Sequence, residues 1–345
     1  MDKNKVLLPN EIFDLAVKNH QKNKLKISEN LYNKVLEINP NDTSVNYNLG
    51  KLYTEIKEYQ KAISCYEKTI KINPNYINAY YNLGLLFKLL GKFQKAIECF
   101  EKVIEIDPNN VQAYNNCAVL LGDTVDLIKA KKYLKKAISI DPKNLDLYWN
   151  LHGQASNIDE ALEPLEELNK INNNYPKAKI MISALNVYKG NFDLYKDLLS
   201  SANSNHAHTR SIKWVFSLPN LPKIFFNRLE FFDAIIPLTE ISRPFYEFGV
   251  WNGESFKYLI NSYKKGFGFD TFDGLPETWH NSQPKGAYSS FGAIPKIEGG
   301  QFVVGKFEDT LSEFFLKKRP IASLINFDAD LYSSTLCALN NSKNI

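Results

Sequence analysis

Small, aromatic and apolar side chains return at a fixed interval through the N-terminal half of the chain. The clearest marker is proline, which recurs every 34 residues. The positions that keep this interval are Pro40, Pro74, Pro108 and Pro142, Ala62, Ala96 and Ala130, Gly50 and Gly84, and Tyr80, Tyr114 and Tyr148. Because proline ends a helix and small residues let helices approach closely, the pattern predicts stacked pairs of helices.

Three copies of the repeat are clear, and two of them show where the helices lie. We expect first helices around residues 46–53 and 80–87 and second helices around 61–66 and 95–100. A degenerate copy precedes them, with Ala16, Ser28 and Tyr32 at the matching positions. After Pro142 the interval shortens, and a further helical hairpin is predicted around residues 185–192.

This pattern resembles the tetratricopeptide repeat. The resemblance implies an α-solenoid over residues 1–202 with a concave surface for an unidentified protein or peptide. Asparagine also keeps the interval, at Asn48, Asn82, Asn116 and Asn150. This row is typical of helix packing in such repeats, and a clamp for a peptide carboxylate is the alternative.

From Pro244 onward the pattern changes to short apolar runs that alternate with amphipathic stretches. Strands are predicted at 245–248, 266–270, 301–304 and 322–327, which indicates a parallel sheet with helices on its faces. The polar stretch 200–208 and a helix around 224–232 make residues 203–241 a helical connector, and the sheet domain covers 242–345. The fold class is therefore an α-solenoid followed by an α/β Rossmann-like domain.

The first strand of this domain leads into a candidate nucleoside site. Glu247 lies at the strand's end, Gly249 and Gly253 are four apart, and Ser255 opens the next helix. Asp270 ends the second strand, where an acid can accept hydrogen bonds from ribose hydroxyls. A nicotinamide dinucleotide is the rival ligand, but the loop lacks the G-x-G-x-x-G spacing.

A second pair of acids, Asp328 and Asp330, follows the last strand. The carboxyl ends of parallel strands form the ligand edge of such sheets, so both acids can face a cleft. They can equally cap the next helix. His206 and His208 invite a metal site, but without nearby Cys or carboxylate partners they are expected to be solvated.

Four blocks in this half, E-F-G-V-W-N-G-E-S, F-D-T-F-D-G-L-P-E, G-K-F-E-D-T-L and F-D-A-D-L-Y-S-S-T, resemble the macrocin O-methyltransferase family. This resemblance implies transfer of a methyl group from S-adenosylmethionine to a hydroxyl of a sugar-containing acceptor. It also implies a methionine pocket shaped by Glu247, Gly249, Gly253 and Ser255, with Asp270 on the ribose. Asp328 is then a ligand of Mg²⁺, and Asp330 is the catalytic base.

Enzymes of that family continue through further strands and a later pair of magnesium-binding acids, so we expect an incomplete methyltransferase domain with an open sheet edge. A non-enzymatic repeat scaffold is the main alternative function. A glycosyltransferase is another, because D-x-D also suits a nucleotide sugar. S-adenosylhomocysteine binding separates methyl transfer from both.

Composition narrows the class of protein without choosing among these functions. The 345 residues are 44% hydrophobic, and 42 basic against 38 acidic residues give a net charge of +4. No basic block calls for nucleic acid or a membrane surface, and the first nine residues lack the apolar core of a signal peptide. We expect a cytoplasmic protein in which Cys65, Cys99, Cys117 and Cys337 are reduced.

Overall fold

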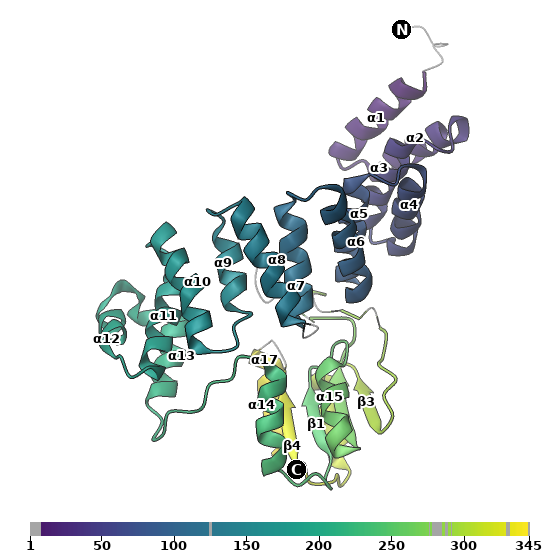
Figure 1. The fold of residues 1–345 in the computed structure, drawn as a ribbon. Coiled ribbons are helices and arrows are strands. Elements are labelled where there is room, and N and C mark those ends of the chain that lie inside the picture. Colours follow the sequence, from purple (N-terminus) through teal and green to yellow (C-terminus); the bar gives the residue numbers. More distant parts are fainter. Residues whose placement is uncertain are drawn as a thin grey trace. The chain divides into compact units, whose positions relative to one another are not determined.

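The computed structural model describes residues 8–123, 126–275, 277, 285–286, 289–290, 292–328 and 332–343. The chain forms two compact units, Met1–Pro222 and Lys223–Ile345. The first is a stack of helices and the second contains a parallel sheet (Figure 1).

Antiparallel helical pairs build the first unit. Its helices are α1 (Pro9–Gln21), α2 (Leu25–Ile38), α3 (Thr43–Glu55), α4 (Tyr59–Ile72), α5 (Ile77–Leu89), α6 (Phe93–Ile106), α7 (Val111–Asp123), α8 (Leu127–Ile140), α9 (Leu145–His152), α10 (Ile158–Ile171), α11 (Pro176–Tyr188), α12 (Asp193–Ser200) and α13 (Ala207–Phe216). The predicted first and second helices fall within α3 to α6, and the structure extends each of them to 13 or 14 residues.

Glycine and alanine set the spacing within each pair. A Cβ added to Gly50 would lie 2.6 Å from the ring of Tyr66, and one added to Gly84 would lie 2.9 Å from the ring of Phe100. The rings of α4 and α6 therefore occupy the space that a side chain at either glycine would need. The recurring alanines, Ala62 and Ala96 among them, have no exposed surface.

The leading copy packs in the same way as the clear ones. Ala16, Ser28 and Tyr32 are fully buried, and the Ser28 hydroxyl donates to the Ala16 carbonyl over 2.8 Å. This bond satisfies a buried hydroxyl and ties α2 to α1.

The second unit holds a sheet with strand order β3-β2-β1-β4, in which all neighbours are parallel. Its strands are β1 (Phe245–Phe248), β2 (Gly266–Asp270), β3 (Gly300–Val304) and β4 (Leu324–Phe327). Its helices are α14 (Arg228–Ile235), α15 (Glu254–Tyr263), α16 (Phe307–Leu316) and α17 (Tyr332–Ser342). This small sheet is compatible with a Rossmann-like domain.

Alternation along β1 gives the sheet two apolar faces. Phe245 packs with Phe232 of α14 and Phe256 of α15. Tyr246 and Phe248 point to the other face, which α16 and α17 cover. The strand is buried on both faces, as expected for the middle of a parallel sheet.

The predicted connector helix begins later than expected. The pattern placed it at 224–232, whereas α14 starts at Arg228 because the Asn227 side chain accepts the Leu229 amide over 2.7 Å and caps the helix. The two units divide at Pro222, and the boundaries at 202 and 241 remain predictions. Among the described helices none combines the length and apolar character that crossing a membrane requires.

Candidate functional site

The first candidate surface is the side of the repeat array on which the first helices α3, α5, α7 and α9 follow one another. We call it the inner face. The predicted asparagine row lies here and joins consecutive repeats. The Asn82 amide donates to the Tyr47 hydroxyl over 3.0 Å, and the Asn116 amide donates to the Tyr81 hydroxyl over 3.2 Å. Each bond spans 35 residues, so it connects one first helix to the next.

The other two asparagines differ in their partners. Asn150 donates to the Asn115 side chain over 2.8 Å, and Asn48 donates to the Ser44 carbonyl of its own helix over 2.8 Å. At least one amide hydrogen of each asparagine in this row is therefore used within the array. Packing of the repeats accounts for the asparagine row without a bound peptide.

Apolar surface lies beside this row on α5. Leu85 is 38% exposed and Leu89 is 50% exposed. They follow Tyr81 at four-residue steps, so all three share one face of the helix. The ammonium of Lys88 lies 3.5 Å from the Asn116 side-chain oxygen. The inner face thus combines leucine, a lysine and hydrogen-bonding side chains.

The second candidate site lies at the carboxyl edge of the sheet in the other unit. Strand order changes direction between β1 and β4, and ligands of open α/β sheets bind at such switch points. Gly249 and Gly253 have φ angles of 91° and 80°, which favour glycine. A Cβ at Gly253 would also lie 3.1 Å from Pro295, so the loop and the segment near Pro295 approach closely here.

Asp270 holds this loop in place. One carboxylate oxygen accepts the amides of Val250 and Trp251, both at 2.8 Å, and the other accepts the Phe272 amide at 2.7 Å. A carboxylate has about four acceptor positions, so these three contacts leave about one for another donor. The residue predicted to bind ribose is therefore also the anchor of the glycine loop.

Glu247 lies at the centre of the edge and is 1% exposed. Its Oε1 atom accepts the Asn326 amide over 3.3 Å, while Oε2 is buried and has no hydrogen-bond partner in the part of the chain that the structure describes. Burial, reinforced by the charge of Asp328, raises the pKa of the Glu247 carboxyl to about 8. The group is thus mostly neutral at pH 7 and can still accept a donor at Oε2.

Arg228 of α14 contacts two of the predicted site residues, Ser255 and Asp328. No sequence pattern pointed to this arginine. Its Nη1 atom donates to the Ser255 hydroxyl over 2.8 Å and to Asp328 Oδ2 over 2.9 Å. Three elements meet at this guanidinium, namely α14, the start of α15 and the end of β4. Its place within an aromatic-rich helix gave no signal of this role.

The structure brings Glu247, Ser255, Asp270 and Asp328 to one edge of the sheet. Asp330 lies outside the described residues. Within the described ranges, no group of three or more His, Cys, Asp and Glu side chains is arranged to hold a metal ion.

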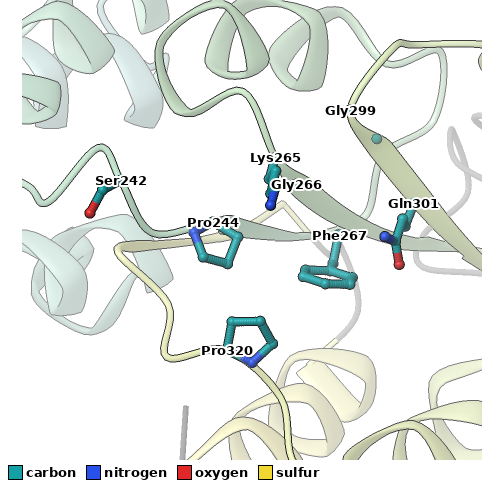
Figure 2. A pocket seen from close by; sticks show the side chains of 9 residues that line it. Ser242, Pro244, Lys265, Gly266, Phe267, Gly299, Gln301 and Pro320 are labelled. Carbon is teal, nitrogen blue, oxygen red and sulfur yellow. The ribbon is translucent and has the colours of Figure 1, made fainter.

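A separate pocket of about 510 Å³ lies at the amino ends of the strands (Figure 2). Its lining residues are Ser242, Pro244, Lys265, Gly266, Phe267, Gly299, Gly300, Gln301 and Pro320. The proline and phenylalanine rings face a common space there, with Lys265 at one side. None of the predicted site residues lines it, because those residues follow the opposite ends of the strands.

Comparison with known families identifies the repeats. Models described as tetratricopeptide repeat match residues 31–64, 77–110 and 111–144, and one described as TPR repeat matches 50–91. The first unit therefore carries tetratricopeptide repeats. These matches do not reach the sheet-containing unit, for which the methyltransferase resemblance stays a prediction. No curated protein matches the chain.

Several solved structures are similar to part of the chain. YrrB, described as a TPR protein with an unusual peptide-binding site, is 20% identical, and the match covers 53% of this chain and 97% of YrrB with a TM-score of 0.46. MamA is 23% identical over 49% of this chain and 94% of its own, with a TM-score of 0.45. PilF of Pseudomonas aeruginosa is 12% identical over 60% and 96%, with a TM-score of 0.47.

Proposed function

We propose that the chain is a scaffold whose repeat array binds an extended segment of a partner protein along the inner face. The observation that carries this proposal is the exposed pair Leu85 and Leu89 beside the hydrogen-bonded row of Tyr47, Tyr81, Asn82 and Asn116. Bonds between repeats hold these side chains in register, so the surface is ordered before a partner arrives. Preorganisation of this kind lowers the entropic cost of binding.

The chemistry of the inner face suggests a partner segment with apolar side chains and an acidic group. Leu85 and Leu89 offer the apolar contact, and Lys88 offers a positive charge next to them. Tetratricopeptide arrays present a continuous surface for such segments. The repeat matches over residues 31–144 support this choice over a purely structural array.

Selection from a displayed random peptide library against the full chain tests the proposal. Selected peptides are then measured by fluorescence anisotropy with the wild type, Leu89→Glu and Ile128→Glu. Ile128 of α8 is 85% exposed and serves as a matched apolar control away from the first helices. We expect Leu89→Glu to weaken binding about ten-fold, or about 1.4 kcal/mol, and Ile128→Glu to leave it unchanged. If the selected peptides bind Leu89→Glu as tightly as Ile128→Glu, the binding surface does not include the inner face around Leu89.

A second candidate function concerns the sheet-containing unit, namely methyl transfer from S-adenosylmethionine to a hydroxyl of a sugar-containing acceptor. The Oε2 atom of Glu247 at the β1–β4 switch point, which has no hydrogen-bond partner among the described residues, favours it. A buried acceptor of this kind suits the ammonium group of an amino acid, which can donate to it. When bound, the cofactor would supply an electrophilic methyl group.

The residues of this edge fit S-adenosylmethionine in part. Glu247 would take the ammonium, Gly249 allows backbone to approach a ligand, and Asp270 keeps about one acceptor position for a ribose hydroxyl. Gly253 fits less directly, because Pro295 fills the space beside it. Ser255 would line the same pocket, and Asp330 remains the proposed base. Magnesium fits less well, because Asp328 already pairs with Arg228.

Calorimetric titration of S-adenosylhomocysteine into the full chain tests this second candidate. We expect one saturable site whose affinity falls about ten-fold in Glu247→Gln, because a bound ammonium lowers the pKa of the Glu247 carboxyl and pairs with the carboxylate, whereas the amide cannot carry this charge. Glu254→Gln on the exposed surface of α15 is the control. Absence of binding by the folded chain would remove methyl transfer and leave the scaffold proposal intact.

A further inference from the structure

The resemblance assigns a magnesium ion to Asp328, but the structure places a different cation there. Arg228 Nη1 lies 2.9 Å from Asp328 Oδ2 and 2.8 Å from Ser255 Oγ. Both are hydrogen-bond distances, and the first is also an ion pair. The two nitrogen-bound hydrogens of Nη1 are therefore directed to two groups of the site.

We infer that Arg228 is the resident cation of this edge, and that Asp328 binds its guanidinium in place of a divalent metal ion. A guanidinium keeps its charge at every physiological pH, so its competition with a metal ion is constant. Magnesium would need Asp328 oxygen in a nearly octahedral shell, and a positive group already hydrogen-bonded to that oxygen opposes both the geometry and the charge.

Among the described residues, the surroundings of Asp328 supply little else for a metal ion. The carboxylate of Asp270 is engaged by three backbone amides, and Glu247 Oε1 accepts the Asn326 amide. No set of three metal-binding side chains forms among the residues placed by the structure. The guanidinium, by contrast, already has its partners in position on α15 and after β4.

Arg228 also keeps capacity for a ligand. The described contacts use Nη1 alone, and the side chain is 58% exposed. Nε and Nη2 can donate to an oxygen of a bound molecule. Within the proposed methyl transfer, on which this last step rests, the guanidinium would take the electrostatic role that the resemblance gives to magnesium.

Binding of Mn²⁺, followed by electron paramagnetic resonance of the free ion, tests the inference without any activity. We expect no saturable Mn²⁺ site on the wild-type chain or on Arg228→Lys, which keeps the positive charge. Arg228→Gln should gain a saturable Mn²⁺ site, at least about ten-fold tighter than any residual binding by the wild type, because the competing charge is gone. Adding Asp328→Asn to that variant should remove the gained site.

Lys257→Gln is the matched control, since Lys257 of α15 pairs with Glu254 over 2.9 Å without touching Asp328. It should behave like the wild type. Circular dichroism of each variant verifies that it is folded. If Arg228→Gln is not folded, Arg228→Lys still reports on the role of the positive charge. One equivalent of Mn²⁺ on the wild type that Asp328→Asn removes would overturn the inference, and so would unchanged Mn²⁺ affinity in Arg228→Gln. S-adenosylhomocysteine binding is measured separately, so failure of the methyltransferase proposal is distinguishable.

Discussion

The carboxyl group of Glu247 illustrates how burial couples a single residue to pH. The folded chain holds it out of water, so its pKa rises to about 8 from an ordinary value near 4.5. Between these two values the folded state keeps the proton and the unfolded state has lost it. The contribution of the Glu247 carboxyl to the free energy of unfolding is therefore greatest below pH 4.5 and falls as pH rises toward 8.

Glu247→Gln should remove this pH dependence. The variant cannot ionise, so its advantage over the wild type in free energy of unfolding should grow by up to about 1.4 kcal/mol per pH unit between pH 5 and pH 8. Urea denaturation at several pH values measures the difference. Glu254→Gln, whose carboxylate is exposed, should show no such trend. An advantage that is constant with pH would mean that Glu247 is ionised in the folded chain.

Sequence reasoning locates the residues of the sheet edge but not how their atoms are used. Glu247, Ser255, Asp270 and Asp328 are recognisable because each lies at or just after the end of a strand or opens a helix. That Asp270 accepts three amides depends on the loop conformation after Val250. The contact of Arg228 with Asp328 joins positions 100 residues apart, which no local pattern can predict. The functional roles of these residues remain predictions.

At the scale of the elements, each hydrogen bond between consecutive first helices should stabilise the folded array. A double-mutant cycle with Tyr47→Phe and Asn82→Ala should give a coupling energy of about 0.5–1.5 kcal/mol, the usual contribution of a hydrogen bond to stability. The cycle that pairs Tyr47→Phe with Asn116→Ala is the control, since Asn116 bonds to Tyr81 instead. Equal coupling in both cycles would show that the variants act through general loosening of the array.

The elements themselves follow largely from the sequence. A 34-residue period leaves few ways to arrange helices, because each glycine must meet the ring of its own repeat, as Gly50 meets Tyr66. Strands β1 and β2 are found with their exact predicted ends, and α14 begins four residues later than predicted because Asn227 caps it. The strand order β3-β2-β1-β4 comes from contacts between distant segments, so the alternation of strand and helix predicts only a parallel sheet.

At the scale of the whole molecule, each unit has a hydrophobic core of its own. Calorimetric unfolding should therefore show two transitions. Gly50→Ala forces a methyl group against the buried ring of Tyr66, and we expect this clash to exceed the helix-forming gain by about 1 kcal/mol. Gly50→Ala should lower the melting temperature of the first unit by about 2–4 °C. Glu247→Gln at pH 8 should raise only the melting temperature of the sheet-containing unit.

Gly153→Ala is the control for the first change, since its nearest neighbour would lie 3.4 Å away, an ordinary contact. Its transitions should match those of the wild type within about 1 °C. One transition that moves with both Gly50→Ala and Glu247→Gln would show that the units unfold together.

The position of β1 between β2 and β4 has a consequence for synthesis on the ribosome. The repeats join neighbouring stretches of chain and can fold as they emerge, whereas β1 must wait for a strand 79 residues further on, where Asn326 meets Glu247. At elongation rates of about 5–20 residues per second, that wait lasts roughly 4–16 s. During this time one edge of a strand that is buried in the finished sheet is open, and the nascent chain is then most exposed to aggregation and most dependent on chaperones.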